Sequence, residues 1–203
     1  MNRQLSEYLL KSIEQPSFID KWCGTVQTVD KQNTPDKTPN RFPIGYPLAG
    51  RDCGRDEAKP VEMVPDSKYK GILYFEDKGI SQTNKSYSSL YGFTSNLRVV
   101  CWLNNKRVGA DQSDSYLSTY AITELTQKLS QYFNGGDVFK NVKALVTGIA
   151  AQDKNIFNNY DYDDKVTAYL QGDYVFFAID LQVSFLIPKR CAVVIPIVET
   201  SHC

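Results

Sequence analysis

Residues 174–187 read YVFFAIDLQVSFLI, and their alternation predicts a long strand with one buried face. Successive side chains of a strand point to opposite faces, so every second residue shares a face. One face carries Tyr174, Asp180, Gln182 and Ser184, and we expect this face to meet solvent or a partner. The other face is apolar throughout: Val175, Phe177, Ile179, Leu181, Val183, Phe185 and Ile187. The sequence therefore predicts a sheet with its core on that face.

Other segments have the composition of strands. Two of them, GILYFEDKG at 71–79 and FTSNLRVVCWLN at 93–104, predict a hairpin over residues 71–103, with the polar segment 80–92 as its long tip. Further strands are expected at 22–29 and 141–149, where β-branched residues are frequent.

Two helices are predicted from apolar residues at helical spacing. The first follows Asn2, a good N-cap, carries Leu5, Tyr8, Leu9 and Ile13 on one stripe, and stops at Pro16. The second spans 115–133 and repeats an apolar residue every fourth position: Leu117, Ala121, Leu125 and Leu129. We expect Asn134, Gly135 and Gly136 to end it, because glycine tolerates the left-handed conformation that follows a last turn.

This order of elements is typical of an α+β fold. We expect an antiparallel-rich sheet with the N-terminal helix and the central helix packed on one face. The length of 203 residues suits a single α+β domain over 1–203, with a long proline-rich arm at 30–68 and a β-hairpin within it.

The arm at 30–68 holds most of the prolines and no regular pattern. Its centre places Phe42, Ile44, Tyr46 and Leu48 among prolines, and an extended chain of this kind can lie on a neighbouring surface. A loop packed on its own domain explains the same composition, so both interpretations stay open.

Charge and targeting signals narrow the class of protein. Lys plus Arg and Asp plus Glu both number 23, which argues against a dedicated nucleic-acid binder because such proteins need a basic excess. No stretch reaches the length of a membrane span, and the first residues lack the apolar core of a secretory signal. We expect a protein made in the cytoplasm, with its five cysteines reduced.

No catalytic, cofactor or metal residues are predicted. His202 is the one histidine and stands next to the end of the chain, so a histidine-based triad or metal site is not expected. The cluster NNYDYDDK at 158–165 fails as a calcium loop in both frames. From Asn159, Asp164 and Leu170 stand where glycine and glutamate are needed, and from Asp161, Lys165 stands at position 5. A noncanonical ion site stays open. The acids of the cluster, Asp161, Asp163 and Asp164, are expected to cap a short turn near 165–170; a hydrolase or carbohydrate-binding site at this loop is the alternative.

Tyrosines stand in several polar segments, at Tyr87, Tyr91, Tyr160 and Tyr162. Tyrosine gives a large contact area with a polar end and is enriched at interfaces. Together with Phe42, Ile44, Tyr46 and Leu48, they form the predicted set of subunit contacts.

The order of elements is similar to that of the tail-terminator and neck proteins of tailed bacteriophages. The corresponding parts are the hairpin 71–103, the central helix 115–133 and the closing strands 141–149 and 174–187. The resemblance implies a structural virion subunit without catalytic residues or cofactors. Copies of the chain would form a ring, expected to be a hexamer, that joins head and tail and contacts other neck or tail proteins.

Overall fold

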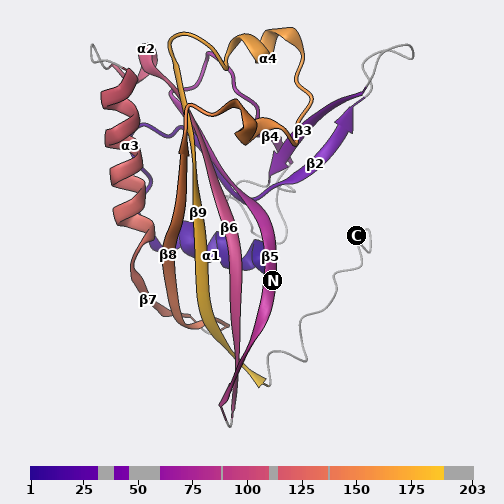
Figure 1. The fold of residues 1–203 in the computed structure, drawn as a ribbon, viewed down its shortest axis with the longest axis vertical. Helices are drawn as coiled ribbons and strands as arrows, with labels where there is room; N and C mark the ends of the chain where they lie inside the picture. The colour runs from indigo at the N-terminus through magenta and orange to yellow at the C-terminus, as the bar shows by residue number, and fades with distance from the viewer. Residues whose placement is uncertain (32–38, 46–59, 88, 110–113, 137, 190–203) are drawn as a thin grey trace, which may run out of the picture.

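A computed structural model describes residues 1–31, 39–45, 60–87, 89–109, 114–136 and 138–189 (Figure 1). Its centre is a sheet in the order β1-β5-β6-β9-β8-β7. The strands are β1 Lys21–Thr25, β5 Gly71–Tyr87, β6 Leu90–Asn104, β9 Tyr174–Pro188, β8 Lys140–Ala151 and β7 Tyr132–Gly135. Every neighbouring pair is antiparallel except β1 and β5, which are parallel. The predicted α+β class and antiparallel-rich sheet are confirmed.

Strand β9 lies in the middle of this sheet, as its alternating pattern predicts. It pairs with β6 along its whole length, from Tyr174 opposite Asn104 to Pro188 opposite Leu90, with no shift of register. The apolar face predicted to be core is buried at every position: Val175, Phe177, Ile179, Leu181, Val183, Phe185 and Ile187.

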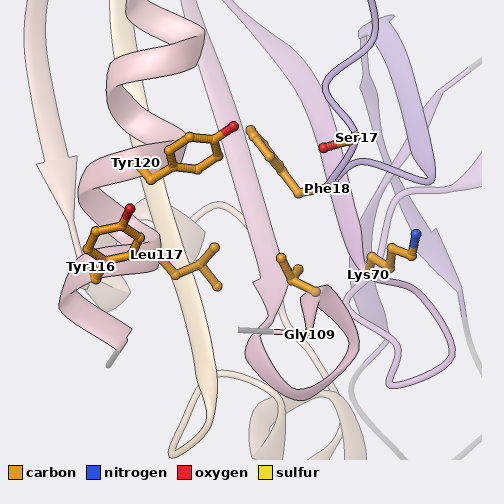
Figure 2. A pocket seen from close by; sticks show the side chains of 8 residues that line it. Ser17, Phe18, Lys70, Gly109, Tyr116, Leu117 and Tyr120 are labelled. Carbon is orange, nitrogen blue, oxygen red and sulfur yellow. The ribbon is translucent and has the colours of Figure 1, made fainter. Parts of the chain in front are cut away.

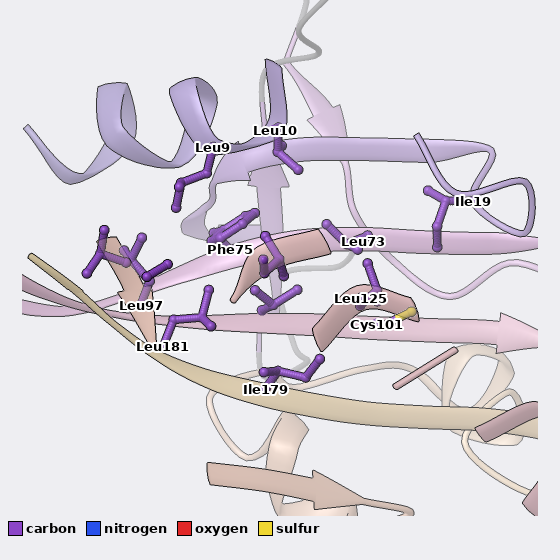
Figure 3. Close-up of a cluster of buried hydrophobic side chains, with 14 of the residues drawn as sticks. Leu9, Leu10, Ile19, Leu73, Phe75, Leu97, Cys101, Leu125, Ile179 and Leu181 are labelled. Atoms are coloured by element: carbon purple, nitrogen blue, oxygen red, sulfur yellow. The ribbon is translucent and has the colours of Figure 1, made fainter. Parts of the chain in front are cut away.

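Helices α1 (Asn2–Ser12) and α3 (Asp114–Leu129) cover this face of the sheet (Figure 1). A short helix, α2 (Asn105–Val108), follows β6. Leu9 and Leu10 of α1 point toward Phe75 and Leu97 of the sheet (Figure 3). The apolar repeat of α3 is buried in the same core: Leu117, Ala121, Leu125 and Leu129.

Two predicted helix ends are wrong. Asn2 is already helical and does not cap α1; its side-chain amide donates to Asp77 Oδ1 at 2.6 Å and its Oδ1 accepts from the Ser95 hydroxyl at 2.8 Å. The central helix ends at Leu129, before residue 133, because Tyr132 pairs with Lys143 and starts β7. In both places a contact with a distant part of the chain outweighs the capping preference of the local sequence.

The second face of the sheet is covered over half of its height. Cross-strand partners form rows on this face, and the two upper rows are apolar and buried: Phe176, Trp102 and Ile72, then Ala178, Val100 and Tyr74. The segment between β8 and β9 folds over them with a 3-10 helix, η1 (Lys154–Phe157), and helix α4 (Asp164–Ala168). Only the lower part of this face, with Gln182 and Ser184, is exposed as predicted.

A charged row marks the lower border of this covered area. Arg98 forms a two-pronged ion pair with Asp180 on the next strand, at 2.7 and 3.0 Å. Glu76 stands opposite Arg98 on the other side, and Gly148 stands opposite Asp180 on β8. A Cβ on Gly148 would lie 3.4 Å from Asp180 Oδ2, so glycine leaves the carboxylate its room.

The second half of the predicted strand at 22–29 and the described parts of the arm form a separate small sheet. The first segment breaks at Val26, and its second half becomes β2 (Gln27–Lys31). This strand pairs with β3 (Asn40–Gly45), which pairs with β4 (Val61–Glu62). In the described part of the arm, Phe42 and Met63 are buried against this chain, which supports packing on its own domain there.

The hairpin between β5 and β6 is longer than predicted. Pairing continues through the polar segment 80–92 to Tyr87 opposite Leu90, so most of the expected tip is strand. Two shifts of register interrupt it, the first between Asp77 and Ile80, where Gly79 has a φ of 105°. Glycine adopts this left-handed conformation without strain.

Gly71 gives a test of the packing at the start of β5. A Cβ there would collide with the Phe18 carbonyl oxygen and lie 2.6 Å from Leu103 Cδ2. We expect Gly71→Ala to lower the free energy of unfolding by about 1–3 kcal/mol, as overpacking does. Gly136→Ala is the control, since its Cβ would meet only Tyr8 Cε2, at an ordinary 3.8 Å. Urea denaturation of both variants measures the difference, and equal stabilities would contradict the described packing.

Candidate functional site

Strand β8 has an unpaired edge over much of its length. Its partner on the outer side, β7, pairs with it only from Lys140 to Lys143. Beyond this point, no strand in the described part of the chain pairs with the side of β8 that faces away from β9. Because β8 continues along β9 to Ala151, residues 144–151 form one edge that is open apart from the Ala144 N–H, which donates to the Gln131 carbonyl oxygen at 3.4 Å.

Of the features that usually protect an open strand, this edge has only a shift of register. It reads ALVTGIAA and contains no charged residue or proline. Leu145 is 53% exposed and Ile149 is 51% exposed. One bulge lies between Val146 and Gly148. Edge strands of single-chain proteins are commonly short, charged or covered, because free N–H and C=O groups attract a further strand. The open β8 edge is therefore the strongest candidate for a contact with another chain.

A second open edge lies at the other side of the same sheet. Strand β1 pairs with β5 only from Ile72 to Phe75, and no other described strand lies on that side of β5. Residues 79–87 of β5 are therefore open there, and Ile80 in this stretch is 41% exposed. Figure 1 shows β5 and β8 on opposite sides of β6 and β9.

An aromatic hollow of about 420 Å³ lies between the start of α3 and the segment before β1 (Figure 2). Its wall carries Tyr116 and Tyr120, one helical turn apart, and Phe18 meets Tyr120 edge-on at 6.1 Å between ring centroids. The one cationic lining residue among those described is Lys70. The hollow can receive an apolar side chain, and the spacing of the two tyrosines is its only signal in the sequence.

The tyrosines of the 158–165 cluster point into the molecule. Tyr160 is 7% exposed, and its hydroxyl donates to Glu76 Oε1 at 2.7 Å. Its ring stacks on Tyr162 at 5.7 Å and meets Tyr74 at 6.3 Å. Burial of these rings raises the pKa of Tyr74, Tyr160 and Tyr162, and the nearby Glu76 carboxylate adds to the rise for Tyr160. Since Tyr160 is a core residue of its own chain, little of its ring is left for a neighbouring subunit.

The aspartates of the same cluster have local uses. Asp163 caps α4 and accepts from the Val166 N–H at 2.9 Å, as expected of an acid that caps a turn. Asp164 stands in the first turn of α4, where a carboxylate is favoured by the helix dipole. Asp161 forms a backbone bridge with Arg41, with N–O distances of 3.0 and 2.8 Å, and so ties this loop to β3.

The other predicted contact residues are placed as follows. Phe42 is buried, and Ile44 is half-buried between Gln27 and Glu62 of the small sheet. Tyr91 is half-buried with the Lys189 ammonium 5.1 Å from its ring. Tyr46, Leu48 and the Tyr87 side chain lie outside the part that the structure describes.

A polar groove of about 570 Å³ runs between the small sheet and the lower part of β5. Each carboxylate that lines it has a partner. Asp30 pairs with Arg41 at 2.8 Å, and this hydrogen bond lowers the pKa of Asp30. Glu76, which is 5% exposed, holds the Tyr160 hydroxyl and pairs with Lys78 at 2.7 Å. Asp77 accepts from the Asn2 side chain and the Gly79 N–H, so each of these acids is already occupied by a neighbour in the fold.

Metal-binding clusters and membrane-spanning helices are absent from the described residues. They contain no group of three or more His, Cys, Asp or Glu side chains placed to hold a metal ion. Nor does any helix among them have the length and apolar character needed to cross a membrane.

No protein-family model matches this chain, and no relative is found among curated proteins. Its function therefore has to be inferred from its own residues and their arrangement.

The Tyr160–Glu76 bond provides a matched pair of variants. We expect Tyr160→Phe to lower the free energy of unfolding by about 1–3 kcal/mol, because a buried carboxylate oxygen loses its donor. Tyr162→Phe should change stability much less, since no described carboxylate accepts a hydrogen bond from its hydroxyl. Denaturant titration of both variants compares them, and a larger loss in Tyr162→Phe would contradict the assigned partners.

The buried tyrosines also predict a loss of stability in alkali. Their pKa is raised in the folded state, so folding favours the neutral form. The contribution of these tyrosines to the free energy of unfolding is therefore complete below the unfolded pKa of about 10. It falls as the pH rises above that value. The slope should reach about 1.4 kcal/mol per pH unit for each such tyrosine. In an alkaline pH titration, part of the rise in tyrosinate absorbance should come late, at the pH where the circular dichroism of the fold is lost. Ionisation of all tyrosines while the circular dichroism is unchanged would refute this.

Proposed function

We propose that this chain is a structural subunit that forms a ring at the neck or tail end of a tailed bacteriophage and joins head to tail. The proposal includes that the chain is not an enzyme, that its partners are copies of itself and other neck or tail proteins, and that it is located in the virion.

The observation that carries the proposal is the open edge of β8. Residues 144–151 combine free backbone groups, absence of charge and two large exposed apolar side chains, Leu145 and Ile149. Such an edge promotes aggregation in a chain that stays monomeric, whereas in a chain that assembles it provides a contact for the next subunit. The second open edge on β5 gives the same sheet two different places for contact.

Two different contact surfaces on opposite sides favour a ring over a simple pair. A twofold dimer uses one patch twice, whereas head-to-tail contact joins two different patches and closes when the rotation between subunits allows it. The resemblance in the order of elements supports a ring of the phage type, which we expect to contain six copies.

The hydrolase or carbohydrate-binding alternative has less support. It depends on the carboxylates of Asp161, Asp163 and Asp164, and the Asp163 carboxylate already caps α4. The tyrosines beside them are turned inward, so the loop presents no aromatic platform.

Native mass measurement and negative-stain electron microscopy of the purified full-length chain test the proposal. We expect closed rings of about six copies, as the resemblance implies. Ile149→Lys should abolish or strongly reduce them while the monomer stays folded, because its side chain is exposed and a lysine on an open edge opposes strand addition.

Val138→Lys is the matched control, since Val138 is 43% exposed but lies in the turn between β7 and β8, outside the open edge. It should form rings like the parent. A clean monomer of the parent at high concentration would overturn the proposal. Rings in Ile149→Lys that match those of Val138→Lys would instead show that the β8 edge does not build the ring.

A further inference from the structure

We propose that the sheet continues from one subunit to the next, with the open edge of β5 of one copy (residues 79–87) hydrogen-bonded antiparallel to the open edge of β8 of its neighbour (residues 144–151). This inference rests on the proposed ring and names the contact that builds it.

The direction of the strands favours this contact. The strands β5, β6, β9 and β8 lie side by side, and each runs antiparallel to the next. Strand β8 therefore runs opposite to β5 within one chain. A second copy related by rotation, with its helices on the same side of the sheet, brings its β5 antiparallel to the first copy's β8. Strand direction then keeps alternating from one subunit to the next. The backbone N–H and C=O groups of β8 and of the neighbour's β5 can pair as in any antiparallel ladder.

The exposed apolar residues of the two edges also match. Ile149 stands opposite Ile179, which belongs to the core under the helices. Ile80 stands opposite Ser95, and Ser95 stands opposite Val183 of the same core. Ile149 and Ile80 thus lie on the helix-bearing face at opposite edges of one sheet, half exposed in the single chain. Joining the edges places both isoleucines on one face of the seam, where cross-strand apolar pairs stabilise a sheet.

One charged residue lies in the two edges. Residues 144–151 of β8 carry no charge, and residues 79–87 of β5 carry one, Lys85. Lys78, which precedes this stretch, is already paired with Glu76 at 2.7 Å. Apart from Lys85, no charge has to lose water along these stretches, which would be costly.

The two open stretches lie at different heights, which matters for ring closure. On β8 the open stretch runs beside Phe177 to Val183 of β9, from Ala151 to Ala144. On β5 it begins at the level of Val183, through Ile80 and Ser95, and reaches the level of Pro188 at Tyr87. Full pairing thus needs a shift of roughly five residues along the strand from one copy to the next. A constant shift of this kind is what tilts the strands of a closed sheet.

The same shift accommodates the flanking strands. Strand β7 blocks β8 at and below the level of Ser184, through Lys143 and Tyr132. With this shift, Tyr87 of the neighbour lies near the level of Val183, next to the part of β8 that β7 leaves open. The neighbour's β1, which covers β5 at Ile72 to Phe75, moves beyond the end of β8. The covered and open parts of the two edges are thus complementary.

A cysteine cross-link tests the contact. Cys23 and Cys101 are buried and can remain, while Cys53, Cys191 and Cys203 are replaced by serine. Ile80→Cys and Ile149→Cys are then introduced together into the full-length chain. A bismaleimide about 7 Å long, the length of two residues along a strand, can join the two cysteines even when they are not directly opposite each other. We expect a ladder of covalent oligomers up to the size of the ring on a denaturing gel.

Each single-cysteine variant is a control and should stay monomeric on the same gel. Rings without a ladder in the double variant would overturn this contact and leave the proposed ring intact. Covalent dimers from Ile149→Cys alone would also overturn it, because they would show β8 paired with β8. Absence of any ring from the parent chain would instead contradict the proposed function.

Discussion

Strand β9 is buried on both faces over its first half and on one face over its second half, and the change occurs at Asp180. Above this residue, Phe176 and Ala178 need a cover, and the segment between β8 and β9 provides it with Ile156, Phe157 and Tyr160. At Asp180 the two-pronged pair with Arg98 is about one-third exposed, so the cover can end there without leaving a charge buried and alone. The small sheet and the segment that carries α4 both attach to the covered part of this face. The attachment is made by the Asp161 bridge to Arg41 and by the packing of Met63 and Tyr160.

Much of the main sheet could be predicted from the sequence because its signals are periodic. The alternation of 174–187 placed one core face correctly, and the fourfold repeat of Leu117 to Leu129 placed α3 on it. The second core could not be predicted in the same way. Phe176 and Ala178 stand between polar residues on the other face, so the pattern there is mixed, and the residues that cover them come from an irregular segment. Tyr160 and Tyr162 look like surface residues among aspartates, yet their rings fill this second core.

The open edges are invisible to sequence patterns for a different reason. A strand edge is open or closed according to which strands pair with it, and pairing is a property of the assembled sheet. The stretch ALVTGIAA has the composition of an ordinary strand, and only the short reach of β7 leaves it without a partner. The ends of helices were mispredicted because of the same kind of long-range effect, since Tyr132 joins a strand and Asn2 joins a polar cluster with Asp77 and Ser95.

That polar cluster has a practical consequence for anyone who produces the protein. Asn2 anchors the beginning of α1 to Asp77, which immediately precedes the open part of β5. An affinity tag fused ahead of Met1 would therefore emerge beside this edge and could shield it by bulk alone. Recombinant material intended for work on assembly is better prepared with the tag cleaved before Met1.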